Sequence, residues 1–274
     1  ARLGFAIAPE TMALCRTLDL DGLARERVMG EMEKALTRSR RPSRCFEALR
    51  EMGQLGPWLK EVAALIGVKQ RADCHPEGDA WTHTMLVVDE AAKLRDEAKN
   101  PTGLMLAALL HDVGKAVAMQ EKDGVIHAYG HETAGVPLAE DFLRRLTGEK
   151  ALCRYVLNMV ELHMKPNMYA AQNSGQKAWN RLFDRSACPE DLLLLANADH
   201  RGRINAAPYA ETERTIRARL SAYEEMMARP HITGADLLAR GIQPGEEMGR
   251  LLEEAHRLRL AGVKKEDALR QMRL

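Results

Sequence analysis

Apolar residues recur along most of the chain at the three- and four-residue spacing of an amphipathic helix. In an early segment, for example, Val28, Met32, Ala35 and Leu36 fall on one stripe, and runs of alternating β-branched residues never exceed a few positions. The pattern predicts helices over residues 9–17, 24–36, 43–52, 58–66, 81–99, 103–112, 131–146, 152–163, 189–199, 211–229 and 246–260. A glycine-containing segment at 122–130 is compatible with a short hairpin. The sequence therefore predicts an all-α fold.

The helical pattern is interrupted at two places that suggest domain boundaries. A polar loop covers residues 73–79, and beyond residue 205 the chain changes to a long charged helix followed by turns. We therefore expect three parts: an N-terminal helical neck or body over residues 1–70, a helical bundle over 71–207 and a helical tail over 208–274. Local cap and turn signals support the first part, where we expect Ser43 to cap a helix and Asp19-Leu20-Asp21 to form a turn.

Composition narrows the class of protein. Across 274 residues, 40 Lys+Arg oppose 39 Asp+Glu, which excludes a globally basic nucleic-acid coat protein and an acidic disordered tail. Hydrophobic residues make up 46% and aromatic residues only 4%, so the core is expected to consist of Leu, Ala, Val and Met. No apolar run could span a bilayer and no secretory signal is visible, so we expect a cytoplasmic protein without a membrane partner. Five scattered cysteines without a C-x-x-C pair indicate reduced thiols.

The sharpest chemical feature is the pair His111-Asp112, directly after an apolar helical run. In mid-helix two adjacent side chains would diverge by ~100°, but at a helix C-terminus the chain can turn so that both face one ion. His83 and Asp199 also lie beside apolar helical runs, where an unpaired polar side chain would be costly. Imidazole and carboxylate groups together suit a divalent metal ion.

This order, a histidine, a His-Asp pair and a final aspartate, resembles the HD-domain metal-dependent phosphohydrolase superfamily. In its members with two metals, histidines in the sequence positions of His131 and His163 complete the shell of the second ion, and the aspartate of the pair bridges both. The resemblance implies one or two divalent ions (Mn, Ni, Fe, Co, Mg or Zn). The metal ligands that it implies are His83, His111, Asp112, His131, His163 and Asp199.

The chemistry expected of such a site follows from charge. Divalent ions neutralise phosphate oxygens and lower the pKa of a bound water. Asp112 and Lys115 are the expected catalytic residues, since the Lys115 ammonium could stabilise charge that develops on a phosphate oxygen. Lys115, Arg201 and Arg203 are the expected substrate-binding residues. A solvated helix end is an equally open interpretation of Lys115, as is a surface role for the two arginines.

We expect different roles for the other polar residues near these candidate ligands. His75, Glu77 and Asp79 precede His83 in the polar loop and could line the mouth of the cleft or orient His83. The remaining histidines are not expected to be ligands: His127 and His200 occupy no position of the family pattern, and His231 and His256 are expected at the surface.

Several further motifs narrow the resemblance. They are Ala1–Phe5, Pro9–Thr11, Glu26–Val28, Arg41–Arg44, His75–His83, Ile232–Leu237 and Gly241–Gly245. Together they resemble the neck, body, HD domain and tail of bacterial CCA-adding tRNA nucleotidyltransferases. The head of that family carries the polymerase site, a Gly-Ser turn followed by a paired-Asp strand, and nothing in this sequence matches it. We therefore expect no nucleotidyl transfer, and a truncated, processed or naturally headless relative.

Three functions are consistent with these residues. The first is a metal-dependent phosphohydrolase, for which the resemblance implies 2′,3′-cyclic nucleotides, phosphomonoesters or tRNA 3′ ends as substrates. The alternative is a non-catalytic tRNA-binding module, in which the basic stretches 38–44 and 264–265 meet the RNA backbone, although a solvated surface explains such short runs equally well. The third is a di-iron oxygenase that uses the same ligands. The sequence leaves the metal, the substrate and the oligomeric state open.

Overall fold

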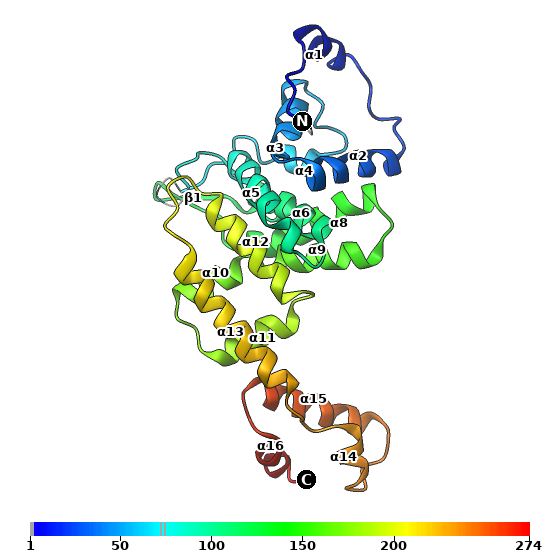
Figure 1. Cartoon of the computed structure of the whole chain (residues 1–274), viewed down its shortest axis with the longest axis vertical. Helices are drawn as coiled ribbons and strands as arrows, with labels where there is room; N and C mark the ends of the chain where they lie inside the picture. The colour runs from blue at the N-terminus through cyan, green and yellow to red at the C-terminus, as the bar shows by residue number, and fades with distance from the viewer. Residues whose placement is uncertain (1–2, 72, 74) are drawn as a thin grey trace. The chain divides into compact units, whose positions relative to one another are not determined.

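The computed structural model describes residues 3–71, 73 and 75–274, and its regular structure is almost entirely helical, which confirms the predicted all-α class. The chain forms two compact units (Figure 1). Unit 1 comprises Ala1–Met168 and Ser186–Glu213, and unit 2 comprises Tyr169–Arg185 and Arg214–Leu274. In this division the segment expected as a neck, residues 1–70, belongs to the same unit as the bundle. The expected division into three parts, with boundaries near residues 70 and 207, stays a prediction.

The helices of unit 1 follow one another along the chain in two groups. The N-terminal group comprises α1 (Pro9–Cys15), α2 (Arg25–Arg38), α3 (Ser43–Glu51) and α4 (Lys60–Ala63). The bundle comprises α5 (Ala80–Leu94), the 3₁₀ helix η1 (Arg95–Glu97), α6 (Pro101–Leu110), α7 (Lys115–Ala118), α8 (His131–Leu146), α9 (Lys150–Leu162) and α12 (Pro189–Arg201). Two helices lead from one unit into the other, α10 (Met164–Ala171) and α13 (Ala210–Ala228).

Helix α6 is the centre of the bundle. Its residues Leu104 to Leu110 are all fully buried. A helix that is apolar on every side is stable only when neighbours surround it, and α6 packs against α2, α5, α9 and α12. Each fully buried leucine contributes roughly 1.5–3 kcal/mol of transfer free energy. The burial of α6 therefore fixes the position of the residues that follow its C-terminus.

The start of α3 differs from the sequence expectation. Ser43 does not cap the helix, because it is the first helical residue and Pro42 occupies the N-cap position. Instead, the buried carboxylate of Asp89 in α5 accepts hydrogen bonds from the Ser43 N–H (3.0 Å) and the Ser43 hydroxyl (2.7 Å). The Arg41 Nε also donates to Asp89 (3.2 Å). The cap thus comes from another helix and ties α3 to the bundle.

Two local predictions concern turns. The expected hairpin is present, with β1 (Gln120–Lys122) antiparallel to β2 (Val125–His127), although its first strand begins before the predicted segment. The Asp19 side chain accepts a hydrogen bond from the Asp21 N–H at 2.8 Å, which gives the turn expected for this Asp-x-Asp.

Unit 2 has a small apolar core of its own. Its other helices are α11 (Gln176–Arg185), α14 (Gly234–Leu238), α15 (Glu246–Leu260) and α16 (Lys265–Gln271). Ile232, Leu237, Ala255 and Ala268 form the buried cluster. A reciprocal capping box of Thr233 and Asp236 begins α14.

The two histidines expected at the surface, His231 and His256, are partly exposed in unit 2. His256 Nε2 lies 2.9 Å from Asp184 Oδ1, and His231 Nε2 lies 3.2 Å from the Val263 carbonyl oxygen. Each ring covers part of a neighbouring element, which the spacing along the chain does not indicate.

Several short helices of the structure were not predicted from the spacing of apolar residues. The segment predicted as a helix over residues 58–66 is α-helical only in α4, and turns flank it. Helices α10, α11, α14 and α16 were not predicted. In α11, Trp179 and Phe183 are buried, and the Phe183 ring lies 5.6 Å from that of Tyr223. Such helices form because tertiary contacts bury one face, and not because of local propensity.

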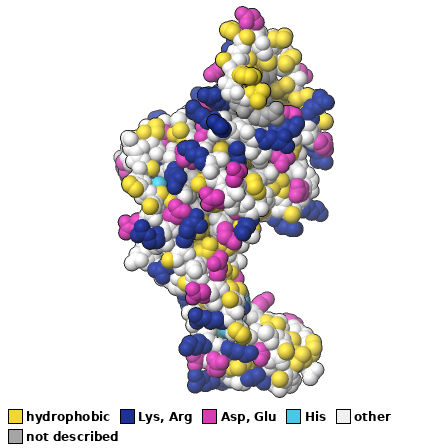
Figure 2. Space-filling model, viewed as in Figure 1, with side chains coloured by type: hydrophobic (Ala, Val, Ile, Leu, Met, Phe, Trp, Pro, Cys, Tyr) yellow, Lys and Arg dark blue, Asp and Glu magenta, His cyan; other side chains and the backbone are white. Residues whose placement is uncertain are grey.

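Figure 2 shows Lys and Arg side chains interspersed with Asp and Glu over the visible face, in keeping with the balanced charge. Across the part of the chain that the structure describes, no helix is both long and apolar enough to cross a membrane. The described cysteines are unpaired, as expected: Cys15, Cys45, Cys153 and Cys188. Cys74 lies outside the described residues.

Candidate metal centre

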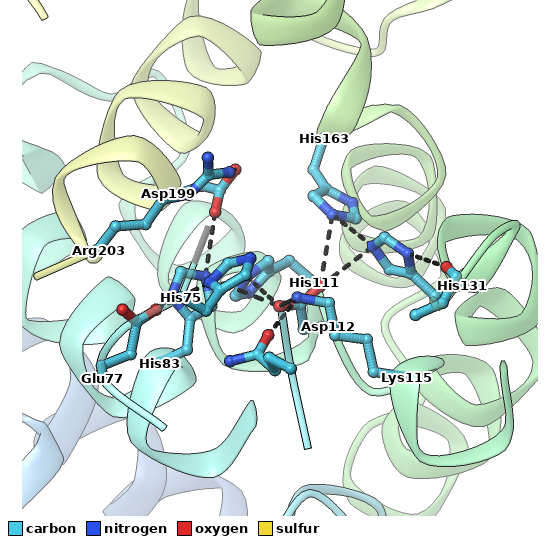
Figure 3. Close-up of polar contacts among 12 residues, drawn as sticks. His75, Glu77, His83, His111, Asp112, Lys115, His131, His163, Asp199 and Arg203 are labelled. Atoms are coloured by element: carbon cyan, nitrogen blue, oxygen red, sulfur yellow. Dashed lines mark hydrogen bonds and ion pairs between the residues drawn. The ribbon is translucent and has the colours of Figure 1, made fainter. Parts of the chain in front are cut away.

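The six predicted ligands come from five helices or their ends, and the structure brings their side chains together in unit 1 (Figure 3). None is more than 5% exposed. His83 is in α5, Asp199 is near the end of α12, and the others lie at helix termini: His111 and Asp112 after α6, His131 at the start of α8 and His163 after α9. The cluster therefore depends on how the helices pack around α6.

The adjacent residues His111 and Asp112 converge as a helix end permits. Helix α6 stops at Leu110, and the chain continues through a turn into α7. The His111 Nε2 lies 3.2 Å from Asp112 Oδ2. Two neighbouring side chains thus face one point, which regular helical geometry would prevent.

Two glycines allow the helices to approach closely enough to form the cluster. A Cβ on Gly114 would lie 2.0 Å from the His131 carbonyl oxygen and 2.5 Å from the Gly135 nitrogen. A Cβ on Gly202 would lie 2.5 Å from Val87 Cγ2. The first contact holds the turn after α6 against α8, and the second holds the end of α12 against α5. A side chain at either position would force the neighbouring helices to shift.

Backbone carbonyls set the tautomers of three histidines. The Nδ1 of His111 lies 2.9 Å from the Ala108 oxygen, that of His131 lies 2.8 Å from the Ala128 oxygen, and that of His163 lies 2.7 Å from the Val160 oxygen. A carbonyl oxygen can only accept, so each Nδ1 carries the proton that it donates. In the neutral imidazoles the lone pair is therefore on Nε2, the atom that faces the cluster. Metal-ligating histidines are commonly oriented in this way.

The Nε2 atoms surround the Asp112 carboxylate. His131 Nε2 lies 3.2 Å and His163 Nε2 lies 3.7 Å from Asp112 Oδ1, and these two nitrogens are 3.4 Å apart. The buried Nε2 of His111 has no hydrogen-bond partner among the described residues. Facing lone pairs and a carboxylate repel one another unless a proton or a cation lies between them. The donor set therefore fits a divalent metal ion.

Burial and neighbouring charges determine the protonation of this group. Burial lowers the pKa of His163 to about 3, with further lowering by His111, so its imidazole is neutral at pH 7. Burial would lower the pKa of His131, but the hydrogen bond and charge of Asp112 raise it overall. Burial would raise the pKa of Asp112, but His111 and Lys115 hold it well below its usual range. Asp112 is therefore ionised and available as a ligand.

On the opposite side of the site, His83 is held between carboxylates. Its Nδ1 lies 2.8 Å from Glu77 Oε1, and its Nε2 lies 3.1 Å from Asp199 Oδ1 and 3.7 Å from Asp112 Oδ2. Burial would lower the pKa of His83, but the hydrogen bonds to Asp199 and Glu77 raise it. The Asp199 pKa is well below normal because the His83 hydrogen bond and the Arg203 charge outweigh burial.

Glu77 orients two histidine rings at once. Orientation of His83 was one of the two roles expected for the residues of the polar loop. Its Oε1 accepts from Nδ1 of both His75 and His83 at 2.8 Å. These bonds outweigh its burial and lower the Glu77 pKa to about 2. Burial and the Lys115 charge lower the His75 pKa to about 4. Asp79, by contrast, caps α5 by accepting from the Thr82 N–H at 2.9 Å.

Of the three basic residues expected to bind substrate, the structure brings two to the cluster. Lys115 Nζ lies 2.6 Å from Asp112 Oδ2 and donates to Gln70 Oε1 at 2.6 Å. Arg203 Nη2 donates to Asp199 Oδ2 at 3.5 Å, and its buried Nε has no acceptor among the residues described. Arg201 is exposed and does not line the cavity, so it lies apart from the site.

A cavity of about 200 Å³ opens onto the cluster. Its lining includes Asp112, Lys115, Asp199 and Arg203, and also Gln70, which sequence reasoning missed because a lone glutamine gives no signal. Among the described residues, three groups of potential ligand atoms each lie within 4.8 Å of one another. One comprises His75, Glu77 and His83, and the two groups around Asp112 are His83, His111 and Asp112, and Asp112, His131 and His163. Asp112 is common to the two groups around it, so its carboxylate could contribute a ligand atom to either.

The two histidines ranked below these candidates have other partners. The Nε2 of His200 donates to the Ala207 carbonyl oxygen at 2.8 Å. The His127 ring stacks on Tyr129. Neither belongs to a group of potential ligand atoms within the described residues.

The fold and this cluster define a class of protein. Residues 80–220, about half of the chain, match the HD domain family, and the chain belongs to that family. HD domains bind divalent metal ions, and the His and Asp groups described above could hold one.

Relatives of known name extend the similarity to nearly the whole chain. It is 33% identical over 275 residues to the Multifunctional CCA protein of Actinobacillus pleuropneumoniae serotype 5b, and 37% identical over 271 residues to that of Burkholderia cenocepacia strain HI2424. These matches cover 96% and 94% of this chain but only 63% and 61% of the relatives. The chain thus spans less than two thirds of the length of the relatives it matches. The resemblance expected from the sequence is confirmed.

A second family match covers the N-terminal helices. Residues 4–66 are similar to the family described as the probable RNA and SrmB-binding site of polymerase A. This range contains α1 to α4 and ends before the polar loop. The region expected as a neck therefore matches a different family from the HD domain.

Proposed function

We propose that the chain is a metal-dependent phosphohydrolase whose HD domain binds one or two divalent ions through His83, His111, Asp112, His131, His163 and Asp199. The observation that carries the proposal is the convergence of imidazole Nε2 atoms on a buried, ionised Asp112. In their neutral form, three of these rings carry the proton on Nδ1 and direct the Nε2 lone pair into the site. Asp112 is the candidate bridging ligand.

The protein residues contribute positioning and charge. Bound divalent ions would supply neutralisation of the phosphate oxygens and a lower pKa for water. Lys115, with its ammonium at the cavity wall, is the candidate catalytic cation that stabilises a phosphate oxygen in the transition state. Arg203 is the candidate phosphate-binding residue, because its buried Nε lacks an acceptor in the described part of the chain. Glu77 keeps His83 in one orientation.

The resemblance to CCA-adding tRNA nucleotidyltransferases suggests the substrates. We expect 2′,3′-cyclic nucleotides, nucleoside phosphomonoesters or tRNA 3′ ends. The cavity walls combine cations with carboxylates, which suits an anionic substrate held beside metal ions.

The test combines metal analysis with hydrolysis. The purified protein is stripped with a chelator, reloaded separately with Mn²⁺, Ni²⁺, Fe²⁺, Co²⁺, Mg²⁺ or Zn²⁺, and assayed with 2′,3′-cyclic AMP and adenosine 2′-monophosphate. We expect metal-dependent turnover that His163→Ala abolishes and His200→Ala retains, because His200 bonds a carbonyl away from the cluster. An inert protein with every metal would refute the proposal. Oxygen-dependent spectra of the iron form would instead favour a di-iron oxygenase.

A second candidate function is RNA binding without catalysis, favoured by the match of residues 4–66 to an RNA-binding family. Exposed arginines lie in or beside α2 and α3: Arg38, Arg40, Arg41 and Arg44. In unit 2, Lys264 and Lys265 line a separate cavity of about 330 Å³ together with Arg229 and Arg259. The expected partner is tRNA.

The salt dependence of tRNA binding tests this candidate. Each phosphate contact steepens the fall of affinity with salt, so the double substitution of Arg40 and Arg44 by alanine should flatten the slope. His163→Ala should leave binding unchanged. If the protein does not bind tRNA at low salt, the candidate is wrong.

A further inference from the structure

An aromatic pair stands at the edge of the cavity that opens onto the metal cluster. The rings of His127, at the end of β2, and Tyr129 stack with centroids 4.9 Å apart and an angle of 19° between their planes. Both residues line this cavity together with Asp112. Tyr129 is nevertheless 82% exposed. Its ring thus rests on one neighbour and leaves most of its surface open.

Packing does not account for Tyr129. A buried tyrosine contributes through the apolar surface that it removes from water, and this ring removes little. The core of unit 1 is built from α5, α6, α9 and α12, and the hairpin strands beside Tyr129 contain no buried residue. An open aromatic face beside a polar cavity is the arrangement by which proteins stack a nucleobase.

The pair is tied to the metal site. The carbonyl oxygen of Ala128, between the two aromatic residues, accepts the hydrogen bond from His131 Nδ1 at 2.8 Å. This is the bond that orients one candidate ligand. The aromatic pair and this candidate ligand are therefore held by the same short segment.

The cavity has different chemistry at its floor and at its rim. Asp112, Lys115 and Arg203, which Figure 3 shows, provide charge for metal and phosphate. His127 and Tyr129 also line the cavity and provide aromatic faces. Its volume of about 200 Å³ is below the roughly 300–1,000 Å³ of clefts that enclose a whole drug-sized ligand. The cavity is thus small for a whole nucleotide, which leaves space for the base at the rim when the phosphate lies at the cluster.

We propose that the Tyr129–His127 pair is a nucleobase platform that makes the site selective for nucleoside phosphates over phosphoesters that lack a base. This proposal rests on the proposed phosphohydrolase function. The Tyr129 face stacks on the base, His127 supports the ring from behind, and the metal cluster holds the phosphate. The nucleoside phosphate is either free or the terminal residue of an RNA.

The test measures discrimination between substrates with and without a base. The metal-loaded protein and the variants Tyr129→Ala and Tyr129→Phe are assayed with 2′,3′-cyclic AMP and with glycerol 1,2-cyclic phosphate. Loss of one stacked base corresponds to about a 5- to 100-fold fall in kcat/KM. We expect that fall in Tyr129→Ala for the nucleotide alone, through KM, with near-normal values in Tyr129→Phe. Phe5→Ala is the matched control, since Phe5 is also highly exposed in unit 1 but does not line this cavity.

Two results would overturn the platform. One is an equal loss for both substrates, which would mean that Tyr129 only positions His131. The other is unchanged selectivity in Tyr129→Ala. A third substrate is an RNA oligonucleotide that ends in a 2′,3′-cyclic phosphate. If Tyr129→Ala lowers kcat/KM more for this RNA than for 2′,3′-cyclic AMP, the platform binds the terminal base of an RNA.

Separate measurements test the proposed phosphohydrolase function and the proposed nucleobase platform. If the unmodified protein hydrolyses neither ester, the proposed function fails, and calorimetric titration with adenosine 2′-monophosphate and with glycerol 2-phosphate still tests the platform. Weaker binding of the nucleotide alone by Tyr129→Ala supports it, and equal affinities in the variant and the unmodified protein refute it.

Discussion

Replacing Gly114 by alanine should disrupt the metal centre without a change to any ligand. A Cβ at this position would lie 2.0 Å from the His131 carbonyl oxygen and 2.5 Å from the Gly135 nitrogen. Ordinary contacts of carbon are about 3.5 Å, so the turn after α6 and the start of α8 must separate by roughly 1–1.5 Å. Metal–ligand distances tolerate only about 0.2 Å. His131 would therefore move out of reach of an ion held by Asp112.

We expect metal affinity to fall at least ~10-fold and stability without metal to fall by ~1–3 kcal/mol, the usual cost of overpacking. Isothermal titration with Mn²⁺ measures the first effect, and urea unfolding in the presence of a chelator measures the second. Gly30→Ala is the matched control, because Gly30 lies within α2 and its Cβ would meet nothing within 4 Å. It should stabilise the protein by ~0.5–1 kcal/mol and leave metal binding unchanged.

A Gly114→Ala protein with unaltered Mn²⁺ affinity would refute the reasoning, because the site could then not depend on the close approach of α8 to the turn after α6. A protein that unfolds completely would be uninformative about the ligands. For that case the milder clash at Gly135, where a Cβ lies 3.2 Å from the Gly114 nitrogen, provides a second variant, Gly135→Ala. Its metal affinity should fall by a smaller factor.

Three further predictions concern positioning, protons and the scaffold. Glu77→Gln removes the carboxylate that orients His83 and should weaken metal binding ~10- to 100-fold, measured by titration, whereas unchanged affinity would exclude an orienting role. The pKa of His83 is raised in the metal-free protein, so a metal must displace its proton. Affinity should therefore rise with pH, and titrations in buffers of different ionisation enthalpy should show proton release, whose absence would contradict the assignment. Asp191→Ala removes the buried acceptor of the Lys99 and Asn100 N–H groups and of the Tyr155 hydroxyl. The free energy of unfolding in urea should therefore fall by ~3–5 kcal/mol. A fall below ~1 kcal/mol would be inconsistent with this network.

The sequence predicted the candidate ligands better than it predicted their supports. His111 and Asp112 were identifiable because they follow an apolar helix, and His83 and Asp199 because they lie beside apolar runs. His131 and His163 became candidates only through the family resemblance. Glu77 was expected only as one of several loop residues. Its bonds to two histidine rings depend on the path of the polar loop, which no periodicity encodes.

Elements whose partners are distant in the chain were predicted least accurately. Ser43 carries a local signal for a helix cap, but the carboxylate of Asp89 takes that role from a position 46 residues away. Within unit 2, His231 contacts Val263 and His256 contacts Asp184, and neither partner is close to its histidine in the chain. Local propensity is a weak force, and tertiary contacts override it.

By itself, the sequence predicted that the chain is helical and, together with its resemblance to the HD-domain superfamily, which imidazoles and carboxylates are candidates for metal binding. The helical class follows from the spacing of apolar residues, which acts locally, whereas His131 and His163 became candidates only through the family resemblance. Only the tertiary structure decided that the candidates meet, through the close contacts of Gly114 and Gly202, and which nitrogen of each ring faces inward. Distances between helices result from packing, and packing is a property of the whole fold.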